Sequence, residues 1–188
     1  FAVFDRRKPR SELTRDLAIV AALQLAALAY GLHTVAQARP AVVALEGSRL
    51  RVVRAIDLDA EELSRAPESL RNLSWTGPRF VATRSPDDAE RLEAIQRGLA
   101  GEDIGMRPGF WLPPERTPTM LADAARPIAV LARLQPARSA ELQRASEQSN
   151  VPAEHLGFLP LLARRTDWSA LVDRRSGALV GYVNIEGF

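Results

Sequence analysis

The residues Leu17–Ala38, LAIVAALQLAALAYGLHTVAQA, decide how this chain is organised, because they are 22 consecutive residues without a charged side chain. An α-helix rises about 1.5 Å per residue, so roughly 20 such residues span the ~30 Å hydrocarbon core of a bilayer. The stretch therefore predicts a transmembrane helix over residues 17–38. A buried helix of a soluble domain is the alternative, since alanine is only weakly apolar and four polar residues dilute the stretch. These four are Gln24, His33, Thr34 and Gln37.

Basic residues crowd the N-terminal side of this stretch, at Arg6, Arg7, Lys8, Arg10 and Arg15. Basic residues next to a span mark its cytoplasmic side. We therefore expect residues 1–16 to form a basic cytoplasmic connector and residues 41–188 to lie on the far side of the membrane. The chain starts with apolar residues rather than with Met, so we interpret the connector as the tail of a truncated upstream segment.

Small residues recur in the apolar stretch at a spacing of about one helical turn. Ala22 and Ala26 are one such pair, and Ala27 and Gly31 are another. Small residues four apart let a second helix approach closely in a membrane. Gln24 is a polar group that would gain from a hydrogen bond to a partner helix. These five residues are candidate partner-binding residues, and an inert anchor is the alternative.

Residues 41–188 have the usual size of one domain with its own core. The sequence has no cysteine, which excludes a disulfide framework and a thiolate metal site. Its basic side chains are almost all arginine, and they alternate with Asp and Glu instead of forming a basic stripe. This distribution does not indicate nucleic-acid binding.

Short β-rich runs stand on both sides of a group of expected helices. Strands are expected over residues 41–45, 49–56, 79–83, 157–164, 167–173 and 178–185, and helices over 59–65, 127–134 and 139–149. Two glycine-containing turns, at residues 46–48 and 174–177, predict hairpins. Strands, then helices, then strands predict an α+β domain with a mainly antiparallel sheet.

A further soluble helix is indicated by Ser85, which has the chemistry of an N-cap and precedes Pro-Asp-Asp. Leu92, Ile95 and Leu99 recur at helical spacing, so we expect them to form the buried stripe of this helix. Pro160 lies in an expected strand and predicts an edge strand or a bulge, because proline has no N–H to donate to a ladder.

The segment Gly105–Pro118 is rich in glycine and proline and carries Phe110 and Trp111. It predicts a long irregular loop. Exposed aromatic side chains on such a loop would bind a partner, which makes Phe110 and Trp111 candidate partner-binding residues. More often, however, such aromatic side chains fold back as a lid on the core.

No motif for catalysis or cofactor binding occurs in the sequence. Only two histidines are present, His33 and His155, and HExxH, CxxC, GxSxG and glycine-rich phosphate loops are absent. The acidic pairs Glu61-Glu62 and Asp87-Asp88 each stand at an expected helix start, where capping explains them. We therefore expect no enzyme, no catalytic residue, no cofactor, no metal and no small-molecule substrate.

Four stretches together resemble the type IV pilin accessory proteins of bacterial inner membranes. They are LQLAALAYG at residues 23–31, TVAQARPAVVALEGSRLRVVRAIDLD at 34–59, TGPRFVATR at 76–84 and LVDRRSGALVGYVNI at 171–185. The most specific part is Gln-Ala-Arg-Pro at residues 37–40, followed by a β-rich run. The resemblance covers nearly the whole chain.

The resemblance implies an inner-membrane chaperone that supports pilin stability and pilus assembly, with a periplasmic main domain. Its implied partners are the major type IV pilin and membrane lipid. A helper with one helix in lipid and one periplasmic domain could contact both the apolar helix and the head of a membrane-inserted pilin. An extracytoplasmic ligand-sensing domain of a membrane receptor is the alternative function, because the final hairpin would suit a small sensor sheet.

Overall fold

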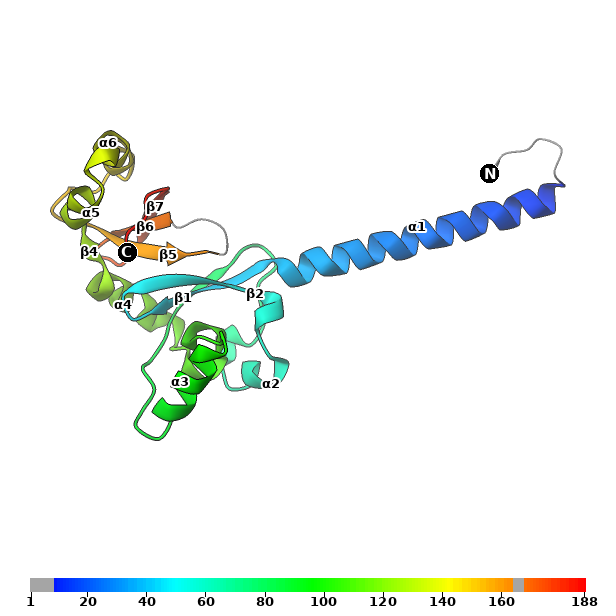
Figure 1. The fold of residues 1–188 in the computed structure, drawn as a ribbon, viewed down its shortest axis with the longest axis horizontal. Helices are drawn as coiled ribbons and strands as arrows, with labels where there is room; N and C mark the ends of the chain where they lie inside the picture. The colour runs from blue at the N-terminus through cyan, green and yellow to red at the C-terminus, as the bar shows by residue number, and fades with distance from the viewer. Residues whose placement is uncertain (1–8, 164–167) are drawn as a thin grey trace. The chain divides into compact units, whose positions relative to one another are not determined.

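The computed structural model of this protein describes residues 9–163 and 168–188. The chain divides into two compact units, residues 1–39 and residues 40–188 (Figure 1). The basic residues Arg6, Arg7 and Lys8 lie outside the described residues, as do the ends of two expected strands at Arg164 and Asp167.

The first unit is described as one helix, α1 (Arg10–Ala38), drawn in blue in Figure 1. It begins after Pro9 and ends before Arg39-Pro40, because the residue that precedes a proline is biased away from the α region. Its residues 11–38 are long and apolar enough to cross a membrane, and the most apolar window has a mean hydropathy of 1.7 with no residue buried. The alternative of a buried helix is therefore not supported by the described residues, and the length and composition of α1 fit a membrane anchor.

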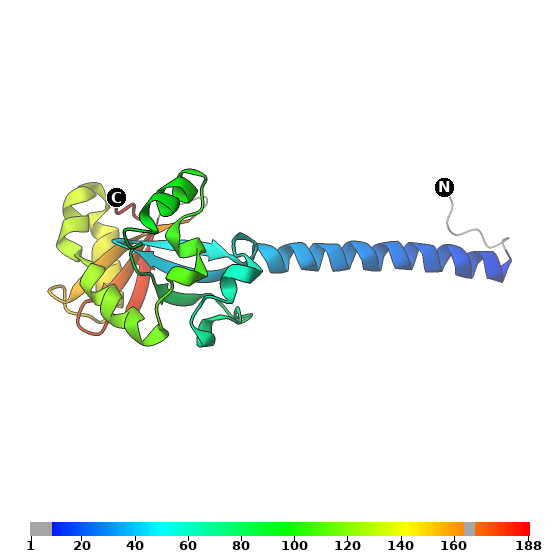
Figure 2. The same ribbon diagram turned by 90° about the horizontal axis from the view of Figure 1, so that it is seen from below.

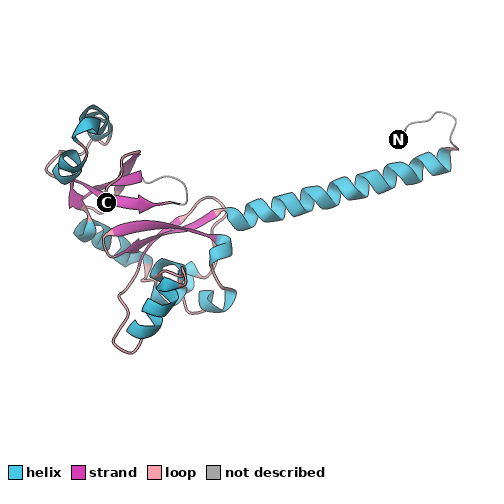
Figure 3. Cartoon of the chain, in the orientation of Figure 1, coloured by secondary structure: helices cyan, strands magenta, loops and turns pink. Residues whose placement is uncertain are grey.

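The second unit is built on one sheet, shown in magenta in Figure 3. Its described strands are β1 (Pro40–Glu46), β2 (Arg49–Arg54), β3 (Arg79–Ala82), β4 (Arg126–Pro127), β5 (Leu156–Leu162), β6 (Trp168–Asp173) and β7 (Leu179–Val183). They lie in the order β3-β1-β2-β5-β6-β7, and β4 pairs with part of β5.

The structure confirms the α+β class, but the prediction of a mainly antiparallel sheet is wrong. The pairs β1–β3 and β2–β5 are parallel, and the pairs β1–β2, β4–β5, β5–β6 and β6–β7 are antiparallel. The sheet is therefore mixed rather than mainly antiparallel. Each parallel pair needs a long crossover connection, and such a connection leaves no local signal in the sequence.

Two hairpins lie where the sequence predicted them. The turn between β1 and β2 contains Gly47 at φ +60°, and the turn between β6 and β7 contains Gly177 at φ +72°. Both values lie in the left-handed region, which glycine adopts without the penalty of a Cβ atom. In the second turn the Asp173 carboxylate accepts hydrogen bonds from the Arg175 N–H and the Ser176 hydroxyl.

Pro160 does not mark an edge strand, because β5 lies between β2 and β6 in the sheet. On one side β5 pairs with β6 along its length. On the other side it pairs with β4 at residues 157–158 and with β2 at residues 161–162. On this side of β5, Pro160 lies between the residues that pair with β4 and those that pair with β2. No strand pairs with β5 at that point, so the missing N–H of proline costs no hydrogen bond of the sheet there.

The described α-helices of the second unit are α2 (Ala60–Leu63), α3 (Arg91–Leu99), α4 (Thr117–Ala124), α5 (Ile128–Leu134) and α6 (Ser139–Gln148). The helices expected over residues 127–134 and 139–149 are confirmed as α5 and α6. Helix α4 follows the glycine- and proline-rich segment and was not expected. Figure 2 shows α5 and α6 (yellow-green) together at one end of the sheet, next to the late strands (orange and red).

Ser85 does not cap a helix, because α3 begins only at Arg91. The turn before α3 is instead held by two reciprocal hydrogen bonds. The Asp87 carboxylate accepts from the Glu90 N–H at 2.9 Å, and the Glu90 carboxylate accepts from the Asp87 N–H at 3.1 Å. This reciprocal pair satisfies donors that a serine cap would otherwise take.

The expectation that Leu92, Ile95 and Leu99 form a buried stripe is wrong. These side chains are 67%, 55% and 87% exposed. The helical spacing is present, but the helix turns its other side toward the domain. Periodicity identifies the apolar face of a helix and does not say whether that face meets the core or solvent.

The core consists of three clusters that use both faces of the sheet. In β1, Val42 and Ala44 belong to one cluster, whereas Val43 and Leu45 belong to another. The continuous run AVVAL is therefore buried on both faces, as is typical of a central strand. The third cluster joins α5 and α6 to β5, β6 and the C-terminal residues, with Phe158 and Leu131 fully buried.

Candidate partner-binding site

A groove of about 760 Å³ opens beside the turn between β1 and β2. Segments far apart in the sequence line it: the turn itself, the residues that follow β3, residues 103–104 and the start of α4. Its apolar lining includes Leu45, Ile104, Leu112 and Met120, and its charged lining consists of Glu46, Arg49, Arg84, Asp103 and Arg116. No contiguous motif encodes this groove, which is why the sequence did not predict it.

The Glu46 side chain joins the groove to the sheet and is only 7% exposed. Its carboxylate accepts hydrogen bonds from the Gly105 N–H at 2.8 Å, the Arg49 Nε at 3.2 Å and the Arg51 Nε at 3.1 Å. Arg51 also forms an ion pair with Asp103. A carboxylate with so little exposure is stable only when it is paired and hydrogen-bonded, and here three donors satisfy it.

Gly105 lies too close to β1 for any side chain. A Cβ atom at this position would stand 2.6 Å from Ala44 Cβ and 2.7 Å from Glu46 Oε1. The Gly105 carbonyl in turn accepts a hydrogen bond from Trp111 Nε1 at 2.9 Å. The Gly105 N–H thus fixes the loop to Glu46 of β1, and the Trp111 indole closes the loop on itself.

Phe110 and Trp111 are both buried, so the interpretation in which they fold back on the core is confirmed and an exposed aromatic loop is not observed. Trp111 packs into the cluster that contains Val42 and Ala44. Leu112 N–H donates to the Ala82 carbonyl at 2.8 Å, which pairs the loop with the end of β3. Direct binding of a partner by these two aromatic residues stays a prediction, and it would require the loop to open.

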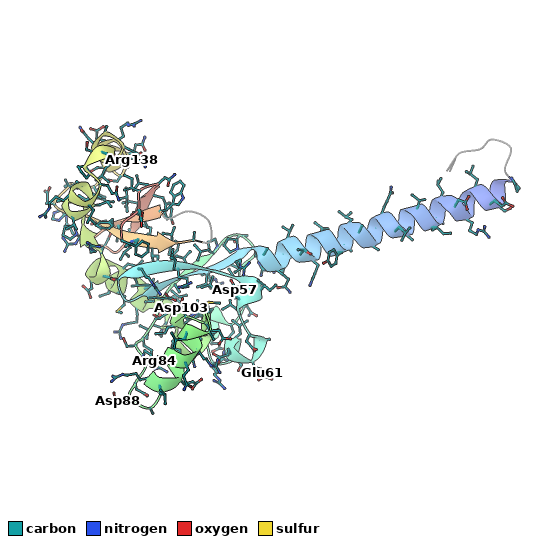
Figure 4. The ribbon with its side chains drawn as sticks, in the orientation of Figure 1. Asp57, Glu61, Arg84, Asp88, Asp103 and Arg138 are labelled. Carbon is teal, nitrogen blue, oxygen red and sulfur yellow. The ribbon has the colours of Figure 1, made fainter. Side chains whose placement is uncertain are left out.

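The Phe110 ring is contacted by two guanidinium groups, from Arg84 at 4.5 Å and from Arg107 at 4.6 Å. Arg84 also binds Glu90 through two hydrogen bonds of 2.6 and 2.7 Å. Such a bidentate pair is stronger and more directional than a single contact. Arg84 therefore connects the turn before α3, through Glu90, to the loop that follows α3, through Phe110. Figure 4 labels Arg84 on this side of the domain.

The Arg84 hydrogen bonds are the main reason that the pKa of the Glu90 carboxyl falls from 4.5 to about 2, and the Asp87 N–H lowers it further. Because the folded pKa is the lower one, this contribution to stability is complete above pH 4.5 and is lost as the pH falls toward about 2. We expect the side-chain carboxyl resonance of Glu90 to titrate below pH 3, and Arg84→Gln to raise its midpoint. A wild-type midpoint near 4.5 would contradict the pair.

A second, polar pocket of about 250 Å³ is lined by residues of α2, the end of α3 and the loop that follows. Arg107 lies there with 7% exposure and donates to Glu93 at 3.1 Å, while its Nε and Nη1 have no hydrogen-bond partner among the described residues. In residues 9–163 and 168–188, no group of three or more His, Cys, Asp or Glu side chains is placed to hold a metal ion.

The five candidates in α1 are all exposed. At about 100° per residue, Ala22 and Ala26 share one side of the helix, whereas Gln24, Ala27 and Gly31 share the opposite side. The five candidates therefore lie on two opposite faces of α1. They belong to a different compact unit from Phe110 and Trp111, and their role in partner binding stays a prediction.

Comparison with known proteins identifies relatives that match this chain over its whole length. The chain is 27% identical over 191 residues to "Fimbrial assembly protein, serogroup I" of Dichelobacter nodosus, an alignment that covers 100% of this chain and 74% of the relative. The serogroup E1 protein of that name, from the same organism, is 26% identical over the same shares. No family model matches the chain, and no solved structure matches it. The predicted resemblance is confirmed in this sense: the chain is a homologue of fimbrial assembly proteins, consistent with a family of pilin-related accessory proteins.

Proposed function

We propose that this protein is a membrane-anchored accessory protein that binds type IV pilin and supports its stability and assembly into pili. The observation that carries the proposal is homology along the whole chain to proteins named for fimbrial assembly. These names support a role in type IV pilus biogenesis. The more specific role of a pilin chaperone is our proposal. Helix α1, apolar and without a buried residue in its most apolar window, supplies the anchor.

The protein acts by binding rather than by catalysis. In the groove beside the β1–β2 turn, the Glu46 carboxylate is occupied by three donors, and Asp103 pairs with Arg51. Carboxylates that are held in this way position a loop and are poorly placed to move a proton to a substrate. The apolar and arginine side chains that share the groove are typical of a protein-binding surface.

The main domain lies in the periplasm and the N-terminus in the cytoplasm. The support is the excess of basic residues before Leu17, since positive charge stays on the cytoplasmic side of a span. Alkaline phosphatase fused after Phe188 should be active, and green fluorescent protein at the same position should be dark. The reverse pattern would exclude this orientation.

The side of α1 that carries Gln24, Ala27 and Gly31 is the one proposed to meet the pilin helix. A hydrogen bond between helices in lipid contributes only ~0.6 kcal/mol, so Gln24→Leu should change pilin capture little. The double variant Ala27→Leu/Gly31→Leu should reduce capture about tenfold, because bulky side chains separate helices that pack through small residues.

Ala22→Leu/Ala26→Leu is the matched control, with the same added volume on the opposite side of α1. Capture is measured as pilin recovered per tagged protein from detergent-solubilised membranes. If all three variants recover as much pilin as the parent protein, α1 serves only as an anchor.

The proposed function is tested by deleting the gene and restoring it. We expect the deletion strain to have less pilin in its membranes and few or no surface pili, and the full chain to restore both. Normal pilin levels and normal piliation in the deletion strain would reject the chaperone role.

A further inference from the structure

The second unit begins almost where the anchor ends. Only Arg39 stands between Ala38, the last residue of α1, and Pro40, the first residue of β1. Two residue steps of chain reach at most about 7 Å, so Pro40 stays within that distance of Ala38 whichever way the second unit turns. Arg39 is also the first charged residue after Asp16, and a guanidinium stays at the membrane–water interface because its transfer into hydrocarbon is costly. With α1 in the membrane as proposed, the start of β1 therefore lies at the membrane surface.

Two segments far apart in the sequence share this end of the sheet with Pro40. Arg54, the last residue of β2, pairs with Pro40, and Ile56 follows it by two residues. Strand β3 runs parallel to β1 and begins at Arg79, so the chain that leads into β3 comes from the same end. Trp75 stands in that chain, four residues before Arg79. Ile56 and Trp75 are thus brought to the end of the sheet at which the chain leaves α1.

Ile56 and Trp75 are large apolar side chains that the second unit leaves in solvent. Their exposed fractions are 59% and 74%. Ile56 lies in the short 3-10 helix Ala55–Asp57, which is fixed because the Asp57 carboxylate accepts hydrogen bonds from the N–H and Nε of Arg54 at 3.1 and 2.8 Å. A single exposed apolar residue is ordinary on a protein surface, but here two stand at the one end that the anchor ties to the membrane.

The membrane–water interface is an environment that both side chains fit. Tryptophan is enriched at this interface, because its ring is apolar and its indole N–H is polar. Isoleucine gains free energy by leaving water and needs no directional partner to do so. A protein partner would have to enter between this end of the sheet and the bilayer, whereas the lipid surface is already within reach.

We propose that the end of the second unit that carries Ile56 and Trp75 rests on the membrane surface and buries both side chains among lipid headgroups and upper acyl chains. This inference rests on the proposed anchoring by α1 and adds a peripheral contact with the membrane, which would hold the second unit in one orientation on the bilayer. The groove beside the β1–β2 turn is at the opposite end of β1, so it would be turned away from the lipid.

The test uses the full chain reconstituted in lipid vesicles, and it exploits the absence of cysteine from the sequence. Nitroxide spin labels are attached to Ile56→Cys and, in a separate protein, to Trp75→Cys. Collisions of each label with oxygen, which concentrates in lipid, and with a water-soluble nickel chelate are then measured by electron paramagnetic resonance. We expect both labels to be more accessible to oxygen than to the nickel chelate, relative to a label in water.

Leu134→Cys is the matched control, because Leu134 is also a large apolar residue and is 44% exposed. It lies on α5, which follows β4, the strand that pairs with Gly157. Counted along β2 and β5, Gly157 is about eight residues, or roughly 26 Å, from Arg54. The control label should therefore be more accessible to the nickel chelate than to oxygen.

The unlabelled protein provides a second readout. Trp75→Phe should reduce the quenching of tryptophan fluorescence by brominated lipid, because Trp111 is buried in the core. Unchanged quenching would overturn the proposal. So would labels at positions 56 and 75 that behave like the control, or that are shielded from both reagents, as a covering protein would shield them.

Extraction of the vesicles with alkaline carbonate separates this proposal from the proposed function. If carbonate removes the chain, α1 is not an anchor, and both the proposed anchoring and this inference fail. If the chain stays in the vesicles while both labels are in water, only the contact through Ile56 and Trp75 fails. Pilin is absent from the experiment, so its result does not depend on pilin binding.

Discussion

Replacing Gly177 by alanine is expected to lower the free energy of unfolding of the second unit by about 2–5 kcal/mol. Two costs add at this position. Gly177 has φ +72°, a conformation that side chains other than glycine adopt with strain, and a Cβ atom there would overlap the backbone carbonyl of Pro118 in α4. Because domains are typically stable by only 5–15 kcal/mol, the variant should be close to unfolding.

Gly47→Ala separates the two costs. Gly47 also lies in a hairpin turn, at φ +60°, but an added Cβ would meet no atom within 4 Å. It should therefore lose only the conformational part, about 1 kcal/mol. The measurement is urea unfolding of the full chain in detergent, followed by tryptophan fluorescence, because the three tryptophans all lie in residues 40–188. Equal losses in both variants would show that the contact between the β6–β7 turn and α4 is absent.

Replacing Glu46 by alanine is expected to cost about 3 kcal/mol, because removing one partner of a nearly buried ionic network leaves the others unpaired. The Gly105 N–H would lose its acceptor, and both Arg49 and Arg51 would lose a carboxylate. The loop that carries Phe110 and Trp111 should then open. We expect faster hydrogen exchange at the Gly105 amide and increased quenching of Trp111 fluorescence.

Two variants control for this change. Glu46→Gln keeps one acceptor oxygen and should lose less than Glu46→Ala, since the Gly105 hydrogen bond can persist. Asp88→Ala removes a carboxylate whose ion pair with Arg91 is on the surface, and it should cost well under ~1 kcal/mol. If Glu46→Ala and Asp88→Ala destabilise the protein equally, Glu46 does not hold the loop.

The parts of this fold that the sequence predicted are those encoded by neighbouring residues. The apolar run before Pro40 is one helix, and the turns at Gly47 and Gly177 connect hairpins, because local steric preferences decide each of these features. The helices that begin after Pro127 and near Ser139 are likewise present as α5 and α6.

The parts that the sequence did not predict depend on which elements meet. The parallel pairing of β2 with β5 joins residues about a hundred positions apart, and it gives Pro160 a central strand with a local gap. The exposure of Leu92 follows from ion pairs between α3 and residues outside it, such as Arg107 and Glu62. The groove beside Glu46 likewise comes from segments brought together only by the fold.

The central claim, that this protein binds pilin in the membrane, is tested most directly by purifying the tagged full chain from membranes after reversible crosslinking and measuring the pilin recovered with it. An unrelated single-span protein with the same tag and expression level is the control. We predict that pilin is enriched with the full chain, and that Ala27→Leu/Gly31→Leu reduces the enrichment. Pilin recovery no higher than with the control, from membranes that contain both proteins, would contradict the account.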